Sequence, residues 1–97
     1  MNMQTQNLAD FDMAEYLNSE QAIAEYISQV LADGDSSELA AALGHIAKAR
    51  GMTEIAKSSG IAREALYKAL RPGAQPRFDT IQKVCKALGV KLTATTA

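Results

Sequence analysis

Apolar residues recur at helical spacing along most of the chain. We expect residues 1–10, which are polar and aperiodic, to be disordered, and Asp12 to cap a short helix that ends near Leu17. A longer helix is expected after Asn18, because Gln21 follows it at the spacing of a capping box. Its apolar stripe has the i, i+3, i+4, i+7, i+8 pattern of an amphipathic helix and consists of Ile23, Tyr26, Ile27, Val30 and Leu31.

A second long helix is expected between two glycines. Gly34 ends the helix before it, and Asp35 with Glu38 repeats the capping signature. Gly51 closes the second helix directly after basic residues, whose charge suits a helix C-terminus. The apolar stripe of this helix consists of Leu39, Ala42, Leu43, Ile46 and Ala47.

Two short helices meet at Gly60. The first is expected at about residues 52–58 and the second at about 62–70. Residues 71–78 read RPGAQPRF, and two prolines and a glycine predict a loop there.

The last helix resumes near Phe78 and ends at Gly89. Its stripe consists of Ile81, Val84, Cys85 and Leu88, so the single cysteine is interpreted as a core residue. Residues 90–97 fit either a short strand or a loose tail. The whole pattern predicts an all-α fold, a small helical bundle of six helices.

The junction at Gly60 has the residues that a helix-turn-helix requires. Two steeply crossing helices need a small residue where they touch and a glycine where the chain turns, and Ala56 and Gly60 are four positions apart. Ser59 departs from the pattern, because a larger apolar residue is usual there. The inward positions are Ile55, Ile61, Leu66 and Ala69.

The second short helix separates into two faces on a helical wheel. The inner arc contains Ala62, Ala65, Leu66, Ala69 and Leu70, and the outer arc contains Arg63, Glu64, Tyr67, Lys68 and Arg71. Such an outer face fits the DNA major groove, since Arg and Lys donate to guanine and Glu accepts from cytosine N4. We therefore expect base contacts from Arg63, Glu64, Tyr67 and Lys68. A solvated surface helix is the plain alternative, and Tyr67 can instead pack along the helix.

Contacts to DNA phosphates need positive groups or free N–H donors around that helix. The expected residues are Thr53, Lys57, Arg71 and Arg77. Any one of them can simply be a solubilising surface residue.

Charge is divided unevenly along the sequence. Residues 1–44 contain eight acidic residues and no Lys or Arg, whereas residues 45–97 contain all ten Lys and Arg and three acids. The two parts therefore carry −8 and +7, within a net charge of −1. We interpret the acidic part as a docking surface for a basic partner, with core packing and mutual neutralisation as the alternative. The expected contact residues are Glu15, Glu20, Glu25 and Asp33.

Composition limits the remaining possibilities. A chain of 97 residues is expected to form one helical domain at 11–92, with acidic helices at 11–50, the helix-turn-helix and closing helix at 51–92, and a tail at 93–97. No apolar run suits a membrane span and no secretory signal is present, so we expect a cytoplasmic protein. One cysteine and one histidine exclude a disulfide and the usual zinc site. We expect no metal, no cofactor and no enzymatic activity.

Two resemblances rest on these motifs. Residues 53–92, including PRFDTIQKVCKALGVKL, resemble the Xre/Cro/λ-repressor class of DNA-binding domain. Over about residues 11–92, the segments DMAEYL, AIAEYI, AALGHIAKARGMTEIAKSSGIAREALYKAL and LGVKL resemble the addiction-module antidote (antitoxin) family. The second resemblance implies an all-α protein that binds its own operator, represses its operon and neutralises a small, basic RelE/ParE-like toxin. A homodimer is expected on DNA, since this class binds paired half-sites.

The chain also departs from that family. RPGAQP replaces the usual loop after the recognition helix, and Arg71 adds a positive charge. Ile61 and Ala62 replace a common Leu-Ser pair, so the side-chain cap expected at position 62 is missing. A phage- or plasmid-type repressor without a toxin and a purely protein-binding module remain the alternative functions.

Overall fold

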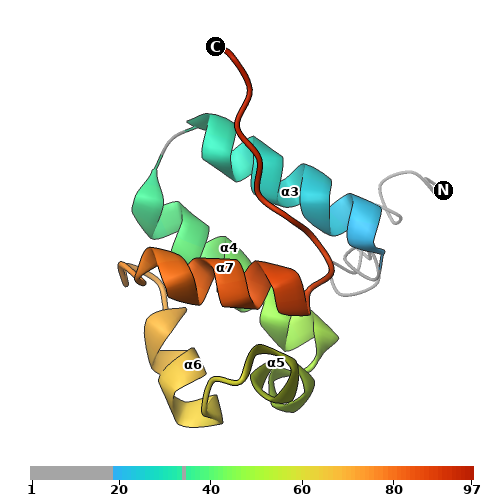
Figure 1. Ribbon diagram of the computed structural model, residues 1–97. Coiled ribbons are helices and arrows are strands. Elements are labelled where there is room, and N and C mark those ends of the chain that lie inside the picture. The colour runs from blue at the N-terminus through green and yellow to red at the C-terminus, as the bar shows by residue number, and fades with distance from the viewer. Residues whose placement is uncertain (1–18, 34) are drawn as a thin grey trace, which may run out of the picture.

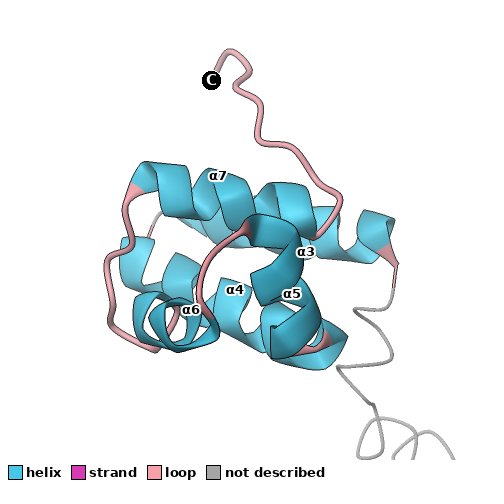
Figure 2. Ribbon diagram, turned by 60° about the horizontal axis from the view of Figure 1, so that its bottom comes forward, coloured by secondary structure: helices cyan, strands magenta, loops and turns pink. Residues whose placement is uncertain are grey.

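The described part of the chain consists entirely of helices and loops. The computed structural model describes residues 19–33 and 35–97, and within them it contains α3 (Glu20–Asp33), α4 (Ser36–Arg50), α5 (Met52–Ser59), α6 (Arg63–Ala69) and α7 (Phe78–Ala87) (Figure 1). No strand occurs in these residues (Figure 2). The predicted all-α class is confirmed, while the short helix expected before Leu17 lies outside the described residues.

Helix α3 packs along α4, and both begin with a side-chain cap. The backbone N–H of Ala22 donates to Ser19 Oγ over 3.0 Å, so α3 is capped one residue later than the expected Asn18. Asp35 caps α4 as expected and accepts hydrogen bonds from Ser37 N at 3.0 Å and Ser37 Oγ at 2.9 Å. These bonds to the charged form lower the pKa of the Asp35 carboxyl.

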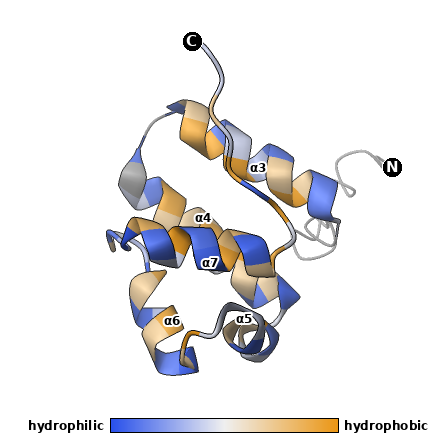
Figure 3. Ribbon diagram, viewed as in Figure 1, coloured by the Kyte–Doolittle hydropathy of each residue, from blue (hydrophilic) through white to orange (hydrophobic). Residues whose placement is uncertain are grey.

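The core lies between the five helices: α3 packs on α4, and α4, α6 and α7 each pack on α5. Its buried side chains come from all five helices or their ends and are Ile23, Ile27, Leu43, Ile46, Ala47, Met52, Ile55, Leu66, Leu70, Val84, Cys85 and Leu88. Cys85 is 2% exposed, as its place in the apolar stripe predicts, and burial raises the pKa of its thiol. Leu31 contradicts the predicted stripe of α3, because it lies near the end of the helix and is 48% exposed. Hydrophobic and hydrophilic residues alternate along α3 and α7 as amphipathic helices require (Figure 3).

One close approach between α4 and α6 depends on a missing side chain. Gly44 lies inside α4, and a Cβ added there would lie 2.6 Å from the carbonyl oxygen of Leu70. Because that atom belongs to the backbone, only a glycine lets the two helices approach this closely. Gly44 therefore fixes how the end of α6 sits on the core.

The segment after α7 is a tail, which decides between the two predicted possibilities. Residues 90–97 form no regular structure, and Figure 1 shows them running past α3. Val90 and Leu92 are half-buried and pack against the core. The first part of the tail is therefore anchored by apolar contacts.

None of the helices in the described ranges is both long and apolar enough to cross a membrane.

Candidate nucleic-acid interface

The turn between α5 and α6 is built around a left-handed glycine. Gly60 has φ +76°, and its N–H donates to the Ala56 carbonyl at 3.0 Å. Nothing lies within 4 Å of a Cβ at this position, so the backbone conformation, rather than space, requires glycine. Ala56, the expected small residue, is half-buried against the core.

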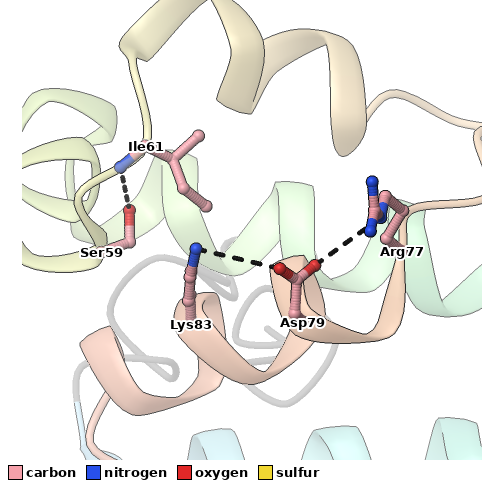
Figure 4. Close-up of polar contacts among 5 residues, drawn as sticks. All are labelled: Ser59, Ile61, Arg77, Asp79 and Lys83. Atoms are coloured by element: carbon pink, nitrogen blue, oxygen red, sulfur yellow. Dashed lines mark hydrogen bonds and ion pairs between the residues drawn. The ribbon is translucent and has the colours of Figure 1, made fainter.

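Ser59 closes the same turn with its hydroxyl. Its Oγ donates to the carbonyl of Ala56 over 3.3 Å. It also accepts from the N–H of Ile61 over 3.3 Å (Figure 4). The larger apolar residue usual at this position cannot make these two bonds. Ser59 thus replaces the apolar packing usual at this position with two hydrogen bonds across the turn.

Helix α6 starts without a side-chain cap. Ala62 is the N-cap residue and makes no side-chain hydrogen bond, as the sequence predicts. The predicted inner arc is wrong at its N-terminal end, since Ala62 and Ala65 are exposed. Leu66 is fully buried and Leu70 is 3% exposed, so these two leucines attach the helix to the core. A seven-residue helix on the rim of the core buries a narrower arc than a helical wheel implies.

The opposite face of α6 is entirely accessible. Arg63, Glu64, Tyr67 and Lys68, the four residues expected to read bases, are all exposed. The structure therefore brings these four side chains together on one surface of one helix.

Arg63 and Tyr67 contact each other one helical turn apart. The Arg63 guanidinium carbon lies 5.3 Å from the centre of the Tyr67 ring, and Nη2 donates to the phenol oxygen over 3.4 Å. Tyr67 therefore packs along the helix and is still 41% exposed. Its ring holds the guanidinium along the outer face of α6.

The four residues expected at phosphates surround α6 without forming one cluster. Thr53 and Lys57 are exposed on α5, and Arg71 is exposed at the start of the loop after α6. The Arg77 side chain is 89% exposed, and its Nε lies 3.9 Å from Asp79 Oδ1. The other oxygen of this carboxylate, Oδ2, lies 3.9 Å from Lys83 Nζ (Figure 4). Arg77 and Lys83 thus share the Asp79 carboxylate. Both ion pairs are exposed and weak, so a phosphate can take the place of Asp79 at Arg77.

Acidic residues lie on α3, which Figure 1 shows at the other end of the molecule from α6. Glu20, Glu25 and Asp33 are exposed, and Glu15 lies outside the described residues. The Glu20 side chain lies beside Gly89, just after α7, where it fills the place that a Cβ would take.

Similarity to known proteins identifies the family. Residues 7–96 match the model of a family described as "Probable addiction module antidote protein". The chain belongs to this antidote family. The chain is also 46% identical over 87 residues, or 90% of each chain, to a protein of Haemophilus influenzae that is described as uncharacterized. No solved structure matches the chain significantly.

The family description concerns a partner rather than a reaction. An addiction-module antidote implies a toxin that it counteracts. Within residues 19–33 and 35–97, no three His, Cys, Asp or Glu side chains stand close enough together to hold a metal ion.

Sequence reasoning missed two positions outside α6. Gly44 fixes the end of that helix, and a lone glycine inside an apolar helical pattern was the available signal. Phe78 is 62% exposed, although the sequence places it only as the start of a helix.

Proposed function

We propose that this antidote binds operator DNA through a helix-turn-helix formed by α5 and α6. The observation that carries the proposal is the outer face of α6, which presents Arg63, Glu64, Tyr67 and Lys68 to solvent while two leucines hold its inner face. Arginine and lysine donate to guanine O6 and N7, and glutamate accepts from cytosine N4, so these side chains match the donors and acceptors of the major groove. Thr53, Lys57, Arg71 and Arg77 contact the flanking phosphates.

The second part of the proposal concerns the toxin. The antidote neutralises a small, basic RelE/ParE-like toxin through its acidic end and, as a homodimer on the operator, represses the operon that encodes both proteins. The exposed Glu20, Glu25 and Asp33 on α3, together with the family description, support this part. Acidic groups repel DNA, so a toxin on α3 leaves α6 free for the duplex.

Removal of one arginine tests the DNA-reading helix. Arg63→Ala is expected to lower affinity for the upstream operator roughly 5- to 150-fold, because one base contact contributes about 1–3 kcal/mol of discrimination. The matched control is Lys91→Ala, which removes one positive charge from the tail beside α3. Gel shifts on operator and scrambled duplexes measure both variants. Equal binding by Arg63→Ala and the parent protein contradicts the assignment of the reading helix.

Salt separates DNA binding from a module that binds only proteins. Binding through several phosphates weakens steeply between about 50 and 200 mM salt, whereas a protein-only module binds the duplex at neither concentration. Copurification with the product of an adjacent reading frame separates the antitoxin from a repressor that has no toxin partner.

A further inference from the structure

A groove edged with lysines lies between α7 and the tail that follows it. Its volume is about 500 Å³. Lys83 and Lys86 of α7 and Lys91 of the tail line this lysine groove and are exposed, and its lining contains no acidic residue. The apolar lining comes from Cys85, Val90 and Leu92. A groove of this composition fits a ligand that combines carboxylates with apolar side chains.

Most of the positive charge of the lysine groove is not matched by a neighbouring carboxylate. Among residues 19–33 and 35–97, Lys83 pairs with Asp79 over 3.9 Å, whereas Lys86 and Lys91 form no ion pair. The Lys83–Asp79 pair is exposed and therefore weak. The three ammonium groups repel one another, so an anionic ligand between them is favoured.

The chain has an acidic and apolar segment that joins α3 beside this groove. Residues 10–18 read DFDMAEYLN, with three acids, four large apolar side chains and no Lys or Arg. They lead through Ser19 into Glu20, whose side chain lies beside Gly89. Gly89 separates the α7 part of the groove lining from the tail part. Figures 1 and 2 show the start of α3 and the end of α7 on the same side of the molecule.

We propose that residues 10–17 bind in the lysine groove of their own chain. Their carboxylates face the three lysines, and their apolar side chains pack against Val90 and Leu92. Eight residues span about 26 Å when extended and about 12 Å when helical, whereas the α7 side of the groove, residues 82–86, rises only about 8 Å. The segment is therefore long enough to run along the groove in either conformation.

Covalent attachment to α3 favours this occupant over others. Exposed ion pairs are individually weak, but a tethered segment binds at an effective concentration in the millimolar range. A basic toxin is repelled by three lysines. DNA phosphates match the lysines but bring no apolar group to the half-buried Val90 and Leu92. The acidic and apolar segment matches both parts of the lining.

Docking gives one carboxylate two competing partners. Glu15 is also an expected contact of the toxin, so a basic toxin and the lysine groove compete for it. Only this consequence rests on the proposed function. The docking itself is measured without toxin or DNA, so its failure and the failure of the proposed function are seen in separate experiments.

Amide hydrogen exchange of the full-length protein tests the docking. In the parent, residues 11–17 should exchange more slowly than unprotected amides. The triple variant Lys83→Glu, Lys86→Glu, Lys91→Glu reverses the charge of the groove and should speed this exchange roughly tenfold, because three attractive pairs become repulsive.

The matched control makes the same charge change on α6 and at its end. Arg63→Glu, Lys68→Glu and Arg71→Glu alter three exposed cations away from α3 and should leave the exchange of residues 11–17 within about twofold of the parent. Both triple variants are measured at about 0.1 M salt, at which charges more than about 10 Å apart are largely screened.

A charge swap separates lost docking from damage to the groove. Asp10→Lys, Asp12→Lys and Glu15→Lys, added to the triple groove variant, exchange the charges of segment and groove. This sixfold variant should regain most of the slow exchange, because opposite charges face each other again. Circular dichroism of each variant confirms that it is folded.

Each other outcome overturns the inference. Unprotected amides at residues 11–17 of the parent contradict it. Slow exchange that survives reversal of the groove lysines places the segment elsewhere, and equal acceleration by the control variant means that only net charge matters. Slow exchange that is lost on dilution assigns the groove to the segment of a second copy. Failure of the charge swap to restore slow exchange contradicts the pairing of segment and groove.

Discussion

Single side chains determine how the turn and the outer face of α6 are formed. Ser59 replaces a usual apolar residue, but its two hydrogen bonds join Ala56 to Ile61 across the Gly60 turn. Arg63 lies along the Tyr67 ring, which restricts the freedom of a long side chain before any ligand is bound. A restricted arginine loses less conformational entropy when it contacts a base.

At the residue scale, Asp35 is expected to make stability depend on pH. Its pKa is lowered, first by the Ser37 hydroxyl and then by the Ser37 N–H, so the ionised carboxylate stabilises the start of α4. A depressed pKa in the folded state gives stability that is present above the unfolded value of 3.8 and is lost as the pH falls through the folded value. Asparagine also caps helices but does not titrate, so Asp35→Asn should remove this dependence.

Urea unfolding between pH 7 and pH 3 measures the effect. The stability difference between the parent protein and Asp35→Asn should shrink below about pH 4. Glu38→Gln removes a carboxylate from the same turn of α4 without removing the cap and serves as the control. Stability curves for the parent and Asp35→Asn that stay parallel over the whole range would show that the cap does not act through its charge.

At the scale of elements, α6 depends on α5 and on one close approach to α4 for its position. Leu66 and Leu70 hold one side of a seven-residue helix, and the Leu70 carbonyl rests against Gly44. Isolated helices of this length are not stable in water, so tertiary contacts maintain α6.

Gly44→Ala is expected to destabilise the fold, opposite to the usual effect of this change. In a helix interior, alanine is normally favoured over glycine by about 1 kcal/mol. Here the new methyl group would overlap a backbone carbonyl, and overpacking of this kind costs about 1–3 kcal/mol. The free energy of unfolding in urea should fall, and NMR shifts should change most at the end of α6.

The control for this prediction is the neighbouring residue. His45 is exposed on the same helix, so His45→Ala should change stability by less than about 0.5 kcal/mol. A Gly44→Ala protein that is more stable than the parent would contradict the prediction. It would mean that α4 and the end of α6 can move apart without a loss of folding stability.

Helical periodicity predicted most of the elements but not how far each one is covered. The stripes of α4 and α7 are core residues as expected, because each helix is covered along its length by neighbours. Leu31, Ala62 and Ala65 were expected inside and are exposed, since they lie near helix ends, where neighbouring segments cover only part of the helix. Periodicity predicts which face of a helix is turned toward the core. Only the fold determines how much of that face the neighbouring elements cover.

The candidate site was predictable to a similar extent. The outer face of α6 follows from the pattern of one short segment, whereas the Gly44 contact joins residues 26 positions apart. The exposure of Phe78 depends on the path of the loop before α7. The lone glycine inside α4 was a local signal, but nothing in the sequence indicates which residue it meets. The assignment of Arg63 and its neighbours to DNA bases, and of Glu20, Glu25 and Asp33 to a toxin, stays a prediction.

At the scale of the whole molecule, the acidic and basic ends are expected to act independently. Glu25→Lys should slow association with the adjacent-frame toxin roughly tenfold at low salt, because it reverses one charge on a surface that attracts a basic protein. Glu25→Gln should have a smaller effect. Operator affinity of both variants should match that of the parent, since α3 lies away from α6 (Figure 1).

Stopped-flow association at two salt concentrations measures this prediction. Glu54→Lys makes the same charge change on α5, at the proposed DNA end, and should leave toxin association unaltered. Equal slowing by Glu25→Lys and Glu54→Lys would indicate that only net charge matters. No slowing by either would place the toxin on another surface.

The separation of acidic α3 from the cationic side chains around α6 also makes the molecule an electric dipole. A polyanion such as DNA exerts a torque on a dipole before the two surfaces touch, and it turns the positive end forward. In the proposed binding to operator DNA, fewer collisions then begin with the wrong face, so the search for the site requires less rotational diffusion. A protein of almost zero net charge thereby gains the orienting benefit of a basic protein without its indiscriminate attraction to every nucleic acid.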